Sequence, residues 1–116
     1  SPDDIGFVSA HGTATDRGDI AESEATNAVF GERIPVSSLK SYFGHTLGAC
    51  GALEAWLGIH MMNEGIFLPT LNLTEVDERC AKLDYITKPT TLECPYFMSN
   101  NFAFGGVNTS LVFRQY

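Results

Sequence analysis

The sequence predicts an α/β protein with a mixed sheet, a buried helix and a C-terminal β-hairpin. Three observations predict it: short apolar runs that suit buried strands, one long segment with apolar residues on nearly every side, and two β-type segments joined by a Gly-Gly pair. The length of 116 residues and the hydrophobic content of 44% are enough to build the core of one domain, or of part of one.

The first half of the chain alternates predicted strands with a helix. Residues 5–10 form a short apolar run after a turn sequence, which favours a buried strand. Residues 20–30 favour a helix beginning near Asp19, because acidic residues in the first turns complement the helix dipole, and Gly31 ends it. Residues 34–39 are typical of a second short strand.

The second half contains a helix and a hairpin. Residues 46–64 place apolar side chains on nearly every side, which predicts a buried helix, and the glycines among them permit close backbone packing. Residues 65–94 hold two prolines and most of the remaining charge, so we expect a long surface excursion. Residues 96–104 and 107–113 are β-type segments, and the Gly-Gly pair between them favours a hairpin turn.

Composition excludes several functional classes. The 14 acidic residues outnumber the 7 basic ones, which gives a formal charge of -7, and no run of Lys or Arg could follow a phosphate backbone. Nucleic acid is therefore a poor candidate partner. The apolar stretches end well short of the roughly 20 residues that cross a bilayer. We expect a soluble, cytoplasmic protein that does not span a membrane.

The three cysteines are an odd number and lack the close paired spacing of a zinc or redox site. Cys80 and Cys94 lie in the predicted excursion. Cys50 falls inside the predicted buried helix, where an inert packed thiol is expected. All three are expected to be free thiols.

Two histidines stand where a predicted strand gives way to a loop or a helix. His11 follows the first strand and His45 precedes the buried helix. Sites in open α/β sheets form at such positions, although a single histidine is more often a satisfied core residue. A metal site that adds His60 is a weaker alternative, because His60 has no second ligand at helical spacing except Glu64.

Several blocks of the sequence resemble the β-ketoacyl-acyl-carrier-protein synthases of the thiolase superfamily. The blocks are HGTAT at 11–15, GD at 18–19 with Glu22, KS at 40–41, GHTLGA at 44–49 with Glu54, and SNNFAFGGVN at 99–108. They span nearly the whole chain in the family's order and spacing, which is more specific than any one block. The resemblance implies a thiolase-like fold, with residues 1–116 forming the C-terminal part of a ketoacyl synthase domain.

The resemblance also implies an activity for the intact protein. These enzymes catalyse decarboxylative Claisen condensation of malonyl-acyl-carrier-protein with an acyl thioester in fatty acid biosynthesis. The implied partners are acyl carrier protein, the N-terminal remainder of the synthase and a second copy in a homodimer, and no cofactor is implied. The alternative is a noncatalytic partner subunit of the chain-length-factor kind, against which the retained His11, Lys40 and His45 argue.

The resemblance assigns catalytic roles to basic residues. It implies that His11 and His45 bind and decarboxylate the malonyl thioester, because neutral imidazoles can donate hydrogen bonds to the thioester carbonyl and stabilise the enolate. Lys40 resembles the active-site lysine, and Glu54 the carboxylate that pairs with it. A buried ammonium needs such a partner. The less favoured alternative is a surface lysine and a helix-face glutamate.

Substrate-binding residues follow from the same resemblance. Thr13 and Thr15 match positions that meet the phosphopantetheine arm, although ordinary turn capping would explain them as well. Phe102 and Phe104 match an aromatic pair beside the acyl pocket, and the Phe104 amide would form half of an oxyanion hole. By aromaticity alone, both would be core residues. Ala103 replaces a more usual glycine, which we expect to stiffen the loop or narrow the acyl channel.

Supporting positions complete the assignment. The residues expected to hold the loops of the site are Asp19, Glu22, Gly105, Gly106 and Asn108. No metal site is expected other than a monovalent cation site at Glu54, Ser99 and Asn108. Ser9 stands where several relatives have Asn, and this difference argues against the cation site.

The resemblance also implies what lies outside this chain. None of the three cysteines occupies the position of the family's nucleophile, so the chain alone is expected to be inactive. The family's half-domain runs β-α-β-α-β-α-β-β, and we expect this chain to enter at the second strand. Residues 5–10 and 96–104 would then each lack a neighbour in the sheet, and the chain alone would self-associate.

Overall fold

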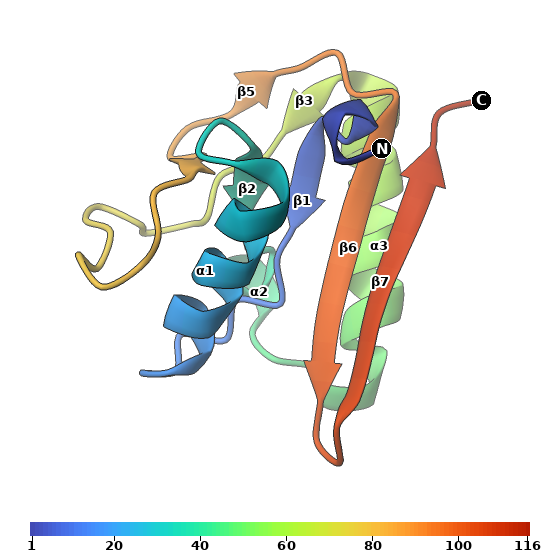
Figure 1. Cartoon of the computed structure of the whole chain (residues 1–116). Helices are drawn as coiled ribbons and strands as arrows, with labels where there is room; N and C mark the ends of the chain where they lie inside the picture. Colours follow the sequence, from blue (N-terminus) through green and yellow to red (C-terminus); the bar gives the residue numbers. More distant parts are fainter.

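The sheet organises the structure. The computed structural model describes all residues 1–116, and five strands form a mixed sheet in the order β4-β2-β1-β6-β7 (Figure 1). Strands β1, β2, β4 and β6 run parallel, while β7 is antiparallel to β6. The bounds are β1 (Phe7–Ser9), β2 (Pro35–Ser37), β4 (Asp84–Tyr85), β6 (Tyr96–Ala103) and β7 (Val107–Arg114). The predicted mixed sheet and C-terminal hairpin are confirmed.

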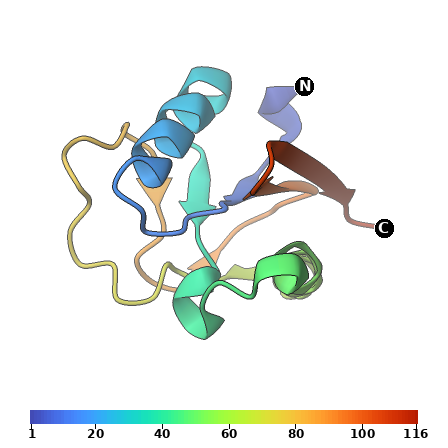
Figure 2. The ribbon, with the colours of Figure 1, turned by 90° about the horizontal axis from the view of Figure 1, so that it is seen from below.

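Helices cover both faces of this sheet. Helix α1 (Gly18–Phe30) lies on one face, and α2 (Lys40–Phe43) and α3 (Cys50–Glu64) lie on the other (Figure 2). Alternation along β1 sends Phe7 into the larger core, with Phe67 and Phe97, and Val8 into the smaller one, with Val36. Both faces of the central strand are therefore buried, as expected for residues 5–10.

Helix α3 is buried on one face only. A Cβ added at Gly58 would lie 2.4 Å from the Phe97 ring, so glycine here allows the close approach of α3 to β6 that was expected. The opposite face leaves Trp56 57% exposed, although the ring of His60 on the same helix contacts it. The prediction of a helix buried all round is therefore wrong for this chain. No helix has the length and apolar character needed to span a bilayer.

The segment from 65 to 94 is more than a surface excursion, which corrects the prediction. It contributes β4 to the main sheet, and β3 (Ile66–Phe67) and β5 (Thr90–Thr91) pair in a second, antiparallel sheet. Phe67 and Ile86 lie in the larger core. Strands of two residues are too short to show an alternating pattern, so the sequence did not reveal them.

The expected gap in the middle of the sheet does not exist. Strand β1 occupies the middle position, where Ser9 is in register with Ser37 of β2 on one side and with Ser99 of β6 on the other. The prediction that residues 5–10 and 96–104 each lack a neighbour is therefore wrong. The sheet ends instead at β4 and β7.

Candidate active site

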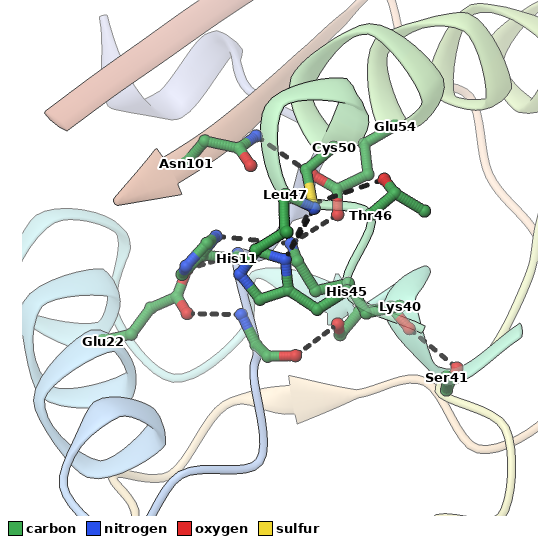
Figure 3. A network of polar contacts seen from close by, with 12 residues as sticks. His11, Glu22, Lys40, Ser41, His45, Thr46, Leu47, Cys50, Glu54 and Asn101 are labelled. Carbon is green, nitrogen blue, oxygen red and sulfur yellow. Dashed lines mark hydrogen bonds and ion pairs between the residues drawn. The ribbon is translucent and has the colours of Figure 1, made fainter. Parts of the chain in front are cut away.

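The two predicted histidines lie side by side at one end of the parallel strands. His11 follows β1 and His45 lies between α2 and α3, and their ring centroids are 5.5 Å apart in an edge-to-face arrangement (Figure 3). The Phe102 ring at the end of β6 lies 5.6 Å from that of His11. Because the carboxyl ends of parallel strands meet at one edge, distant segments converge here.

The loop that carries His11 is held by helix α1. The Glu22 carboxylate accepts hydrogen bonds from the backbone N–H groups of His11 and Gly12, each at 2.8 Å. Burial raises the pKa of Glu22, and these two hydrogen bonds oppose that shift. Asp19 accepts a further bond from the backbone N–H of Ala14 at 3.2 Å. The two expected supports, Asp19 and Glu22, thus fix the backbone on both sides of Thr13.

A buried ion pair lies beneath the histidines. Lys40 Nζ, at the start of α2, is 2.5 Å from Glu54 Oε1 on α3, and both side chains are almost fully buried. Asn101 of β6 donates from Nδ2 to the other Glu54 oxygen at 3.0 Å. The expected pairing of Lys40 with Glu54 is therefore present. Asn101 was not singled out from the sequence; its place on β6, two residues after Ser99 on the face toward α3, was the available signal.

Hydrogen bonding fixes which nitrogen of each imidazole carries the proton. Lys40 Nζ lies 3.3 Å from His11 Nδ1, and an ammonium can only donate. The backbone N–H of Leu47 donates to His45 Nδ1 at 3.0 Å. Both Nδ1 atoms are therefore acceptors, and each neutral ring carries its proton on Nε2. Burial, and secondly the charge of Lys40, lower the pKa of His11, which favours its neutral form.

The two threonines lie at an open cleft. The hydroxyl oxygens of Thr13 and Thr15 are 3.0 Å apart and exposed. Together with Lys40 and His45, they line a cleft of about 720 Å³, whose far wall comes from the segment around Thr70 and Leu71. The binding role of the threonines stays a prediction.

Other predicted residues do not join this cluster. The side chain of Phe104 is 92% exposed, and no hydrogen bond or ring contact connects it with either histidine. Gly105 and Gly106 form the hairpin turn with φ of 84° and 79°, a region that glycine enters without strain. The exposed ring of Phe104 says nothing about its backbone N–H, which the turn positions. The role of the Phe104 amide therefore stays a prediction.

The expected cation site is not assembled. Asn108 is in register with Phe102, so the alternation of the strand places Asn108 on the opposite face of the hairpin from Ser99. The buried hydroxyls of Ser9 and Ser99 have no hydrogen-bond partner. The alternative three-histidine site is also not formed, because His60 packs on the Trp56 ring and no group of three metal-binding side chains gathers anywhere in the chain.

Cys50 is buried on helix α3, as expected, but it also lies in the site. It is the first residue of α3, after a 3-10 turn at Leu47–Ala49. Its Sγ is 3.2 Å from His45 Nδ1. The sequence did not reveal this contact because the helix starts later than its apolar pattern does.

Comparison with known proteins identifies the family of this chain. Residues 1–74 match the family described as beta-ketoacyl synthase, C-terminal domain. The chain belongs to this family. Among curated β-ketoacyl synthases, 3-oxoacyl-[acyl-carrier-protein] synthase 1 of Escherichia coli (strain K12) is 41% identical over 112 residues, covering 96% of this chain and 28% of that protein. The chain therefore spans little more than a quarter of the length of this relative.

Solved β-ketoacyl synthases share the fold. The crystal structure of a beta-ketoacyl synthase from Burkholderia phymatum STM815 superposes with a TM-score of 0.97 at 64% identity, covering 99% of this chain and 28% of that one. A ketosynthase solved in complex with its chain length factor, from Xenorhabdus doucetiae, gives a TM-score of 0.90 at 41% identity, over 97% of this chain and 29% of that one. The predicted thiolase-like fold and its assignment to the C-terminal portion are confirmed.

Proposed function

We propose that this chain is the C-terminal part of a 3-oxoacyl-acyl-carrier-protein synthase and supplies its malonyl-decarboxylating residues. The observation that carries the proposal is the pair formed by His11 and His45. Their rings are 5.5 Å apart, and each has Nδ1 occupied as an acceptor, so that each neutral ring carries a donor on Nε2. Two donors held so close together suit a single oxygen on which charge develops.

The reaction proceeds by loss of carbon dioxide and formation of a carbon–carbon bond. The thioester carbonyl of malonyl-acyl-carrier-protein accepts hydrogen bonds from both Nε2–H groups. When the bond to the carboxylate breaks, its electron pair moves into the enolate, whose oxygen these donors stabilise. The enolate carbon then attacks the acyl thioester on a cysteine of the remaining synthase, and the thiolate leaves. The Phe104 amide is assigned to the oxyanion of this second step.

Lys40 and Glu54 support the pair. The Lys40 ammonium occupies Nδ1 of His11 and places a positive charge near the developing enolate, while Glu54 balances that charge in the buried site. Thr13 and Thr15 are assigned to the phosphopantetheine arm, Phe102 and Phe104 to the acyl pocket, and no cofactor takes part.

The proposal includes partners and a compartment. Acyl carrier protein is the expected substrate carrier, as the name of the Escherichia coli relative states for that protein. The N-terminal remainder of the synthase and a second copy in a homodimer are the other expected partners. Three free cysteines suit a reducing compartment such as the cytoplasm.

A second candidate function is a noncatalytic partner subunit. It is kept because one similar solved structure is a complex of a ketosynthase with its chain length factor. The presence of His11, His45, Lys40 and Glu54 in one cluster favours the enzyme, because a subunit without catalysis has no need for two oriented imidazoles.

Half-reactions of the complete synthase test the proposal. His11→Ala and His45→Ala are expected to abolish carbon dioxide release from malonyl-acyl-carrier-protein while leaving radiolabelled acyl-enzyme formation largely intact. His60→Ala, on the exposed part of α3, is the matched control and is expected to preserve both. Loss of acylation in both site variants would mean that the histidines act on the nucleophile. Absence of carbon dioxide release from the unmodified protein would favour the noncatalytic subunit.

A further inference from the structure

Cys50 is a residue to which the proposed mechanism gives no role. Its side chain is 2% exposed, and its Sγ lies 3.2 Å from His45 Nδ1. The hydroxyl of Thr46 donates to the same sulfur at 3.5 Å (Figure 3). The thiol therefore stands between a hydroxyl donor and a ring nitrogen, closed off from solvent.

The direction of these hydrogen bonds follows from the Leu47 amide. A backbone N–H can only donate, so its 3.0 Å bond requires a lone pair on His45 Nδ1. The Cys50 thiol can then interact with Nδ1 only by donating its S–H. The sulfur in turn accepts from Thr46. In this series of hydrogen bonds, the Thr46 hydroxyl donates to Cys50 and the Cys50 thiol donates to His45. Each donor thus has an acceptor, as buried polar groups require.

We propose that Cys50 is a positioning residue, which acts with the Leu47 amide to hold the His45 ring in place with its proton on Nε2. The inference rests on the proposed function, because it matters only if the Nε2–H group of His45 donates a hydrogen bond to a thioester oxygen. The Leu47 N–H and the Cys50 thiol share the single lone pair of Nδ1, so the thiol adds a second restraint on the rotation of a ring whose tautomer the amide already requires. Cys50 itself does not touch the substrate.

Substitutions at Cys50 separate this role from packing. Cys50→Ala removes the donor, and we expect carbon dioxide release by the complete synthase to fall about three- to tenfold, the range for loss of one hydrogen bond. Cys50→Ser keeps an O–H donor and is expected to restore most of the rate. Cys94→Ala removes another buried thiol, outside the site, and is the matched control, expected to leave the rate unchanged.

The tautomer gives a second readout, which packing alone would not change. In ¹⁵N-histidine spectra of the synthase, with the His45 signals identified by their loss in His45→Gln, we expect a protonated Nε2 and an unprotonated Nδ1. Cys50→Ala is expected to broaden or shift the Nδ1 signal, and Cys50→Ser to return it. A wild-type His45 protonated on Nδ1 would overturn the inference, even if Cys50→Ala does not fold.

The outcomes distinguish this inference from the proposed function. Unchanged carbon dioxide release and an unchanged Nδ1 signal of His45 in Cys50→Ala, with activity still lost in His45→Ala, would overturn the role of Cys50 alone. Full activity in His45→Ala would instead overturn the proposed function.

Discussion

At the residue scale, the site depends on a buried ion pair whose charges balance each other. Glu54 has no exposed surface and binds Lys40 through one oxygen and Asn101 through the other. Removing one member of such a pair leaves an uncompensated charge in the interior, which costs far more than an exposed pair contributes. The chemistry of the histidines above it therefore depends on the pair remaining intact.

Lys40→Met tests this dependence. We expect it to lower the free energy of unfolding by about 3–5 kcal/mol, because the Glu54 carboxylate would stay buried without its cation. Lys88→Met, at an exposed lysine, is expected to change it by less than about 0.5 kcal/mol. Denaturant unfolding of both variants in the same protein measures the difference. Equal effects would show that the pair does not support the fold.

The protonation of His11 is a second prediction at this scale. Burial is the largest cause of its lowered pKa, followed by the Lys40 charge, so His11 should be less than half protonated at pH 6.5, where an ordinary histidine is half protonated. Its neutral form is then lost only as the pH falls further. An NMR titration should place the His11 midpoint below 6.5, and Lys40→Met should move it upward. A midpoint above 6.5 would contradict the proposed electrostatics.

The sequence predicted the site residues that lie in motifs, but not those whose roles depend on packing. Lys40, Glu54 and the histidines could be named because they stand in blocks that resemble a known family. Asn101 and Cys50 could not, because their roles depend on which face of β6 meets α3 and on where α3 begins. These are properties of packing, which one sequence does not carry.

At the element scale, the contact between α3 and β6 positions Glu54 beside Asn101. Gly58 makes it possible, because an added Cβ would lie 2.4 Å from the Phe97 ring. We expect Gly58→Ala to lower the free energy of unfolding by about 1–3 kcal/mol, because the added methyl group overpacks the contact with Phe97. Gly51→Ala, in the same helix with only an ordinary contact to Asn101, should be neutral or stabilising by up to about 1 kcal/mol. Thermal unfolding of both variants measures these changes. A change of stability with the same sign in Gly58→Ala and Gly51→Ala would refute this packing.

The long strands were predicted from the sequence, and the short ones were not. The eight-residue strands β6 and β7, with the glycine turn between them, were expected at nearly the observed bounds. The two-residue strands β3, β4 and β5 were not expected. The end of α1 was predicted, because Gly31 follows Phe30 and ends the helix.

At the scale of the whole molecule, apolar side chains remain at the surface. The large exposed ones include Leu47, Trp56, Phe104, Val107 and Val112. The expectation that the chain alone self-associates therefore rests on these residues and on the free edge of β7, and not on a missing central strand. Sedimentation velocity at micromolar concentration should show oligomers, and Val107→Lys with Val112→Lys should reduce them. A monodisperse monomer that binds no hydrophobic dye would contradict this prediction.

The order of the strands was the part of the whole molecule that the sequence could not provide. Strands β1 and β6 are neighbours in the sheet although about ninety residues separate them in the chain. No local pattern records such a pairing, so β1 and β6 were expected to be separated by a strand that the chain lacks. The same long-range pairing brings Phe102 to His11 and thus completes the site.

A crystal structure of the complete synthase with a non-hydrolysable malonyl thioester analogue tests the central claim most directly. We expect the thioester carbonyl oxygen to lie about 3 Å from Nε2 of both His11 and His45, with Lys40 still bound to Glu54. A carbonyl oxygen held by only one imidazole, or by neither, would contradict the shared role of the two histidines.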